Sequence, residues 1–316
     1  MAAGRRAGRG RSVATKGAKK GFEMGDSGFP WPLGTRKEPI EWPHKARLAV
    51  ILTIAFEWSQ KLASGEGTFH RVGSTFPKDA VHKMDFPLVS MWEYGGKVGI
   101  WRILDLLDKY DIKASFVTNG IVAERYPEAT REVTRRGHEI IAHSYDQGVL
   151  LCTMRLEEER EDIRKTVSAI KKTTGVTPIG WVSPGFRSTI NTPTLLVENG
   201  FMFLSDYLDD DLPYSIDVAG KPFIIIPHSN EVNDIRWFSG FTPMHVFEFF
   251  KNEFDVLYGE GETHPKLMNV AFHTYLGGRA HRTKALEAII KYAKGFPNVW
   301  FAKREQIARW WLEHYV

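Results

Sequence analysis

The stretch RLAVILTIAFE, residues 47–57, is an apolar run that ends in an acid. The same arrangement returns further along the chain, where polar residues capable of chemistry follow apolar runs: His143 after HEIIA, Asp206 after FMFLS, His228 after KPFIIIP and His273 after PKLMNVAF. In a chain that alternates strands with helices, the strands end on one face, and barrel enzymes place their active sites there. The pattern therefore favours an enzyme with an α/β barrel fold.

Apolar runs bounded by turn signals predict eight strands, and the segments between them show the helical period. The predicted strands are residues 47–56, 113–119, 138–144, 178–184, 201–207, 221–228, 265–274 and 298–303. The predicted helices lie near residues 97–110, 127–136, 155–172, 192–199, 243–258, 282–294 and 304–314. This alternation favours a (β/α) barrel over an open sheet. No helix separates 201–207 from 221–228, which leaves an antiparallel pairing of these two runs open.

Two features concern the organisation of the chain. A length of 316 residues with 43% hydrophobic content suits one large core, and barrels of this length form single domains. We therefore predict one catalytic domain over residues 26–316. The roughly forty residues after Phe56 are too many for a simple connection, so we expect a lid or substrate loop there.

Residues 1–25 are predicted to form a disordered basic tail. Seven Lys and Arg residues fall within the first twenty positions and leave 35 basic against 38 acidic residues in the remainder, so the body lacks the basic excess of a nucleic-acid-binding protein. The tail holds no apolar stretch, which excludes a secretory signal or a membrane span there but leaves an organelle transit peptide open. Cys152 is the sole cysteine, which favours a reducing compartment and a cytoplasmic location.

Several stretches together resemble the allantoinase-like branch of the polysaccharide deacetylase superfamily. They are residues 93–116, GHEIIAHS at 137–144, DYLDDDLPY at 206–214, VNDIRW at 232–237 and the segment from Phe272 to the C-terminus. The resemblance covers nearly everything from Trp42 onward, and the branch is also similar to cyclic-imide hydrolases and some peptidoglycan deacetylases. It implies a distorted barrel of seven to eight strands, usually assembled as a homotetramer.

The chain departs from the pattern of this superfamily at two positions. Deacetylases carry an acidic pair after the first strand, whereas Glu57 is the lone acid here. They carry His-x-x-x-His after the third strand, whereas Gln147 replaces the second histidine after His143. We expect Glu57, His143 and, more weakly, Gln147 to hold a divalent metal, with zinc favoured by such ligands. Allantoinase-type relatives also lack the second histidine and are thought to work without added metal, so a metal-independent site stays open.

The resemblance also suggests roles for residues around the metal. His273 matches the catalytic histidine of the family and is predicted to be the general acid for the leaving nitrogen. From the residues themselves, the acidic run 209–211 is a solvated acidic turn, a helix N-terminal cluster or a group that orients His273 and the substrate, and we favour Asp210 as the site residue. The stretch 233–236 either ties a loop to the barrel rim or contacts the substrate. The predicted substrate-binding residues are Trp58, Trp92, Trp181, Phe186 and Arg187, although such aromatic residues can equally belong to the core.

These residues suit a flat small ring better than an extended glycan. The sequence therefore predicts a hydrolase that opens a small cyclic imide or cyclic amide by attack of an activated water on the ring carbonyl. The alternatives are an allantoinase, an N-deacetylase of glycan or peptidoglycan, and a catalytically dead binding protein on the same fold. The expected partners are a small cyclic substrate and further copies of this chain in a homotetramer, without nucleic acid or membrane.

Overall fold

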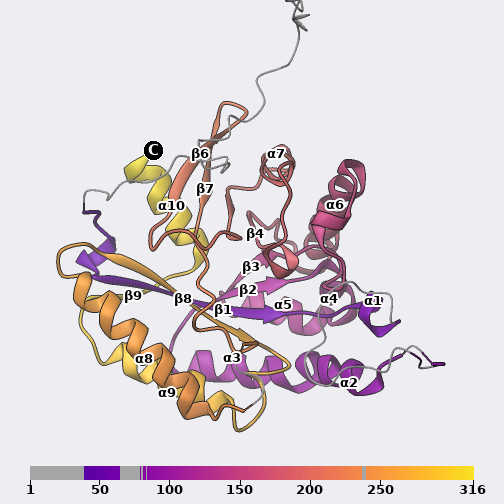
Figure 1. The fold of residues 1–316 in the computed structure, drawn as a ribbon, viewed down its shortest axis with the longest axis horizontal. Helices are drawn as coiled ribbons and strands as arrows, with labels where there is room; N and C mark the ends of the chain where they lie inside the picture. The colour runs from indigo at the N-terminus through magenta and orange to yellow at the C-terminus, as the bar shows by residue number, and fades with distance from the viewer. Residues whose placement is uncertain (1–38, 65–78, 80, 83, 237–239) are drawn as a thin grey trace, which may run out of the picture. The chain divides into compact units, whose positions relative to one another are not determined.

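The computed structural model describes residues 39–64, 79, 81–82, 84–236 and 240–316, and Pro39–Val316 form one compact unit (Figure 1). The predicted basic tail of residues 1–25 lies outside the described residues, as do residues 65–78, 80 and 83 of the predicted lid. Within the described part of the chain, no helix combines the length and the apolar character that crossing a membrane requires.

One mixed sheet forms the centre of the unit. Its strands are β1 (Leu48–Phe56), β2 (Ser115–Thr118), β3 (Glu139–Ala142), β4 (Gly180–Trp181), β5 (Phe203–Leu204), β6 (Tyr214–Val218), β7 (Lys221–Ile225), β8 (Lys266–His273) and β9 (Val299–Phe301). The order is β6-β7-β5-β4-β3-β2-β1-β8, with β9 also paired to β1. β1 is buried along its whole length. All pairings are parallel except that of β6 with β7.

The sheet curves into an incomplete barrel with helices around it (Figure 1). An isolated parallel bridge joins Asn233, in the segment after β7, to Ala271 of the edge strand β8. The predicted distorted (β/α) barrel is confirmed. Each of the eight predicted strands matches an observed one, and the unpredicted strand is β6. β7 pairs in parallel with β5 and antiparallel with β6, so the antiparallel partner is Tyr214–Val218 rather than the run at 201–207.

Helices follow most strands. They are α1 (Gln60–Ala63), α2 (Phe86–Tyr94), α3 (Ile100–Lys109), α4 (Gly120–Arg125), α5 (Pro127–Arg135), α6 (Leu156–Thr174), α7 (Thr192–Glu198), α8 (Pro243–Glu260), α9 (Thr283–Lys294) and α10 (Arg304–Tyr315). The seven predicted helices correspond to α3 and α5–α10. α1 and α2 lie in the segment predicted as a long loop, and α4 is a short addition after β2.

A π-helical turn, Gly95–Gly99, leads into α3 and packs against the chain just after β8. A Cβ atom on Gly99 would come within 2.0 Å of the carbonyl oxygen of Thr274. Because no larger residue fits this distance, glycine allows α3 to approach the residue that follows His273. The close approach helps to fix the end of β8.

Arg304, the first residue of α10, lies inside the barrel and is 0% exposed. Its guanidinium donates hydrogen bonds to four side chains from different parts of the sheet: Thr53 at 2.7 Å, Asn269 at 2.9 Å, Ser205 at 3.1 Å and Nδ1 of His228 at 3.2 Å. Burial lowers the pKa of Arg304 to about 10, so the group stays charged at neutral pH. One side chain thus connects β1, β8 and the segments after β5 and β7.

Replacing Arg304 with Met should lower the free energy of unfolding by about 2–4 kcal/mol, because buried polar groups lose their donor. Urea unfolding measures this loss. The matched control is Arg309→Met on the exposed side of the same helix, where an ion pair with Glu305 contributes at most about 1 kcal/mol. Equal losses in the two variants would show that the interior does not depend on the guanidinium.

Candidate active site

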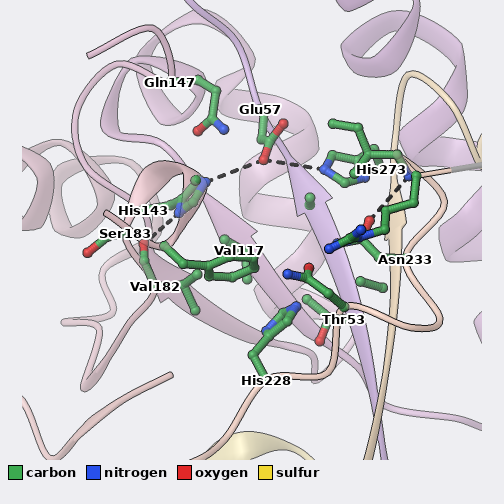
Figure 2. Close-up of a pocket in the computed structure, with 17 residues that line it drawn as sticks. Thr53, Glu57, Val117, His143, Gln147, Val182, Ser183, His228, Asn233 and His273 are labelled. Carbon is green, nitrogen blue, oxygen red and sulfur yellow. Dashed lines mark hydrogen bonds and ion pairs between the residues drawn. The ribbon is translucent and has the colours of Figure 1, made fainter. Parts of the chain in front are cut away.

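A small cavity lies where the strands end, and Figure 2 shows the residues around it. Its volume is about 110 Å³. Side chains alternate along a strand, so Thr53, Ala55 and Glu57 of β1 and its continuation share one face and line the cavity together. The predicted residues that line it are Glu57, His143, Gln147, Phe186 and His273. Parallel pairing of β1 with β8 places Ala55 beside His273, which explains why the first and last of these strands meet here.

Glu57 is buried between two imidazoles (Figure 2). Its Oε1 lies 3.3 Å from Nε2 of His143 and 3.6 Å from Nε2 of His273. The hydroxyl of Tyr275 donates to Oε2 at 3.4 Å. Burial alone would raise the pKa of Glu57, but the charge of His273 and the contact with His143 outweigh it, and the pKa is lowered. The carboxylate is therefore ionised at neutral pH.

The ring of His143 is held in one tautomer. Nδ1 lies 2.5 Å from the carbonyl oxygen of Val182. A carbonyl oxygen only accepts, so Nδ1 carries the proton and Nε2 keeps its lone pair when the ring is neutral. Nε2 is buried and has no well-aligned hydrogen-bond partner among the described residues. The neighbouring Ser183 is fixed in turn, because its backbone N–H donates to Asp206 at 2.7 Å.

His273 is held by Asp234. Nδ1 of His273 lies 2.6 Å from Oδ1 of Asp234, and the backbone N–H of His273 donates to the same carboxylate at 3.0 Å. Burial lowers the pKa of His273, but the carboxylates of Glu57 and Asp234 outweigh this effect and raise it to about 9. At neutral pH, Nε2 therefore carries a proton toward the cavity. This arrangement suits a general acid.

Asp210 does not contact His273 as the sequence had predicted. It lies in the turn before β6, where Oδ1 accepts the backbone N–H of Leu212 at 3.0 Å, and it lines a second cavity. The backbone carbonyl oxygen of the neighbouring Asp211 accepts from the N–H of Leu267, so this turn lies at the start of β8, whereas His273 lies at its end. Asp234 takes the orienting position instead. Sequence analysis had singled out residues 233–236 only as a loop tie or substrate contact.

The predicted aromatic and cationic binding residues separate into two groups. Phe186 lines the cavity, whereas the other four residues do not. Trp181 is fully buried in the core, where its indole N–H donates to Ser183 at 3.0 Å. Trp92 stacks on Tyr275, Trp58 lies under the guanidinium of Arg125, and Arg187 is exposed. The three tryptophans are buried, but they pack outside the cavity rather than lining it.

Two of the predicted metal ligands, Glu57 and His143, present atoms that are compatible with binding a divalent metal. Nε2 of His143, buried 3.3 Å from Oε1 of Glu57, and the ionised Glu57 carboxylate offer one nitrogen and one oxygen. The backbone carbonyl that orients His143 is a common supporting contact for such ligands. Gln147 lines the same cavity, but its amide oxygen accepts a bond from Asn119 at 3.3 Å. Among the described residues, no group of three His, Cys, Asp or Glu side chains has metal-binding spacing. An ion would thus need Gln147 or water as well.

Comparison with known proteins places this chain in a family. Residues 84–204 match the polysaccharide deacetylase family. Over 307 residues the chain is 30% identical to a Schizosaccharomyces pombe protein described as a polysaccharide deacetylase, and the match covers 88% of this chain and 95% of that protein. The chain belongs to the polysaccharide deacetylase family. The predicted family membership is therefore confirmed.

Two solved structures resemble this family member closely. One is a Pseudomonas aeruginosa protein described as a polysaccharide deacetylase, with 33% identity, a TM-score of 0.78 and coverage of 87% of this chain and 94% of that one. The other is Puue allantoinase, with 33% identity, a TM-score of 0.77 and coverage of 87% and 93%. The resemblance to the allantoinase-like branch agrees with these neighbours.

His143→Ala should abolish binding of zinc to the purified protein, because it removes the single nitrogen of the expected ligand set. Metal content after incubation with zinc and gel filtration checks this. His314→Ala, at an exposed position of α10, is the matched control and should bind as the unmodified protein does. Undiminished zinc in the His143 variant would exclude this residue as a ligand.

Proposed function

We propose that this deacetylase-family hydrolase opens a small cyclic imide or cyclic amide. The observation that carries the proposal is the size of the cavity at Glu57, about 110 Å³, together with the side chains of Val117, Val182 and Phe186 in its wall. An apolar cavity of roughly 150 Å³ accommodates benzene, so this one suits a single small ring. An extended sugar chain would have to remain outside it.

The residues around the ring divide the chemistry between them. Glu57 accepts the proton of the attacking water as its oxygen bonds to the ring carbonyl carbon. His273 donates its Nε2 proton to the ring nitrogen as the carbon–nitrogen bond breaks, and Asp234 stabilises the imidazolium that makes this transfer effective. A divalent metal held at Glu57 and His143 would activate water and polarise the carbonyl when bound. A cyclic imide gives the open-chain amide acid, and a cyclic amide gives the open-chain amino acid.

Turnover of succinimide, hydantoin, allantoin and dihydrouracil tests the proposal. We expect at least one of these rings to be opened and no acetate to be released from chitooligomers or peptidoglycan. A loss of turnover with a chelator would support the metal-assisted reaction, whereas retained turnover would assign the reaction to Glu57 and His273 alone. Acetate release without ring opening would overturn the proposal in favour of N-deacetylation.

Two alternatives have a specific observation in their favour. Structural similarity to Puue allantoinase supports allantoin as the ring, which the same experiment distinguishes from the other substrates. Family membership supports N-deacetylation. A protein that binds rings without opening any of them would be a binding protein on an enzyme fold. The homotetramer and the cytoplasmic location remain predictions.

Asp234→Asn should reduce kcat on the order of 10²-fold with a small change in KM, because the amide cannot stabilise the imidazolium of His273. Steady-state kinetics with the ring that the unmodified protein opens measures this. Asp217→Asn, at an exposed position of β6, is the control for a lost carboxylate. If Asp210→Asn reduced kcat more than Asp234→Asn, the orienting role would return to Asp210.

A further inference from the structure

The side chain of Gln147 has a fixed orientation that none of the steps above uses. Gln147 lines the cavity at Glu57 and is only 3% exposed. Its side chain ends in a carboxamide, whose oxygen only accepts hydrogen bonds and whose NH₂ group only donates them. The end that faces the cavity therefore decides whether Gln147 can hold a cation or bind an oxygen atom of the substrate.

Asn119, between β2 and α4, fixes this orientation. Its own carboxamide lies between two backbone groups with opposite hydrogen-bonding roles. The backbone N–H of Trp58 donates to Oδ1 of Asn119 at 3.3 Å, and Nδ2 donates to the backbone carbonyl oxygen of His143. Rotation of this amide would place donor against donor and oxygen against oxygen. Asn119 therefore has one orientation, with its NH₂ group toward the segment that follows β3.

The NH₂ group of Asn119 orients Gln147 in turn. Nδ2 of Asn119 donates to Oε1 of Gln147 at 3.3 Å. A rotated Gln147 amide would bring two NH₂ groups together, so its oxygen stays on the side of Asn119. Figure 2 shows the amide nitrogen of Gln147 on the side nearer Glu57. Nε2 makes no hydrogen bond to a described residue, so its two hydrogens are available to a ligand in the cavity.

The backbone around Gln147 is also held in place. Its N–H donates to the carbonyl oxygen of Trp58 at 3.3 Å. The carboxylate of the preceding Asp146 accepts the backbone N–H groups of Gln60 at 2.9 Å and of Gly148 at 2.8 Å. The amide of Gln147 is thus oriented before a ligand binds. Such preorganisation is the condition under which a single donor stabilises the charge that develops in a reaction.

Two donors flank Glu57. Figure 2 shows Gln147 and His273 on opposite sides of its carboxylate, and Nε2 of His273 lies 3.6 Å from Oε1. The bond cleaved in a cyclic imide or amide joins a carbonyl carbon to a nitrogen, so its oxygen and its nitrogen lie next to each other. With the nitrogen toward His273, the oxygen faces Gln147. A buried N–H group gains free energy from such an acceptor.

We propose that Gln147 is a catalytic residue whose NH₂ group donates to the carbonyl oxygen of the bond that is cleaved. This inference rests on the proposed function for the ring. As water bonds to the carbonyl carbon and gives its proton to Glu57, the π electron pair moves to this oxygen, and Nε2 stabilises the negative charge. The C=O bond then re-forms, the carbon–nitrogen bond breaks, and the nitrogen takes the proton of His273. A cation at Glu57 and His143 accordingly receives no ligand atom from Gln147.

Gln147→Met tests the donor, because methionine keeps the length of the side chain and lacks both the NH₂ group and the oxygen. With the ring that the unmodified protein opens, kcat should fall about 10²–10³-fold with little change in KM, as expected for removal of one such donor. Zinc content after incubation and gel filtration should equal that of the unmodified protein. Gln60→Met, at an exposed position of α1, is the matched control and should alter neither quantity.

The outcomes for Gln147→Met separate the two proposals. Ring opening with an unchanged kcat would overturn the donor role and leave the proposed function standing, even if the unfolding temperature fell. A rise in KM alone would make Gln147 a contact for the unreacted ring and overturn its role in the reaction. Loss of zinc, as expected for His143→Ala, would make Gln147 a metal ligand and overturn the inference.

Asn119→Asp tests the orientation itself. The new carboxylate still accepts from Trp58 but cannot donate to Gln147, so the Gln147 amide should turn and present its oxygen to the cavity. We expect kcat to fall as in Gln147→Met and zinc to bind on the order of tenfold more tightly. Adding Gln147→Met should return zinc binding to that of the unmodified protein. Tighter binding that persists in the double variant would assign the gain to the added charge and overturn the orientation. The Gln147→Met measurements decide the inference if Asn119→Asp does not fold.

The side-chain amide of Gln147 also gives a readout without turnover. Its ¹H–¹⁵N signals, assigned by their loss in Gln147→Met, should shift on addition of succinimide, because Nε2 then donates to a carbonyl oxygen. A shift in a protein that opens no ring would support the donor and overturn the proposed function. Signals unchanged by succinimide would overturn the donor, whether or not a ring is opened.

Discussion

The buried guanidinium of Arg304 is the constraint around which the barrel interior is arranged. Its donors reach Thr53 on β1, Asn269 on β8, Ser205 after β5 and His228 after β7. A cation in this position requires acceptors on every side, which explains why small polar residues occupy strand positions that a barrel usually fills with branched apolar ones.

The candidate active site depends on the same strands. Parallel pairing carries the end of β1 beside the end of β8, so Glu57 and His273 meet although they lie far apart in the sequence. β2 pairs in parallel with β1, and β3 pairs in parallel with β2, so His143 after β3 lies at the same edge. The carboxylate between two imidazoles is therefore a consequence of strand order. Family membership and the two structural neighbours agree with a hydrolase of this fold.

Much of the fold and of the candidate site could be predicted from the sequence, because the spacing of apolar residues and the turn residues determine structure locally. Glu57, His143 and His273 follow strong strands, and their convergence follows from parallel pairing alone. Asp234 could not be found in this way, since the segment that carries it forms only an isolated bridge. Local patterns also gave no sign that Arg304 enters the barrel, or that Trp181 serves the core rather than the cavity. These outcomes depend on contacts between residues distant in sequence.

Arg304 lies 251 positions after Thr53. During synthesis on the ribosome, β1 to β8 therefore emerge with their polar interior groups still hydrated, and they acquire their common donor only when α10 has left the exit tunnel. A nascent barrel without that helix would hold an interior that water has to fill.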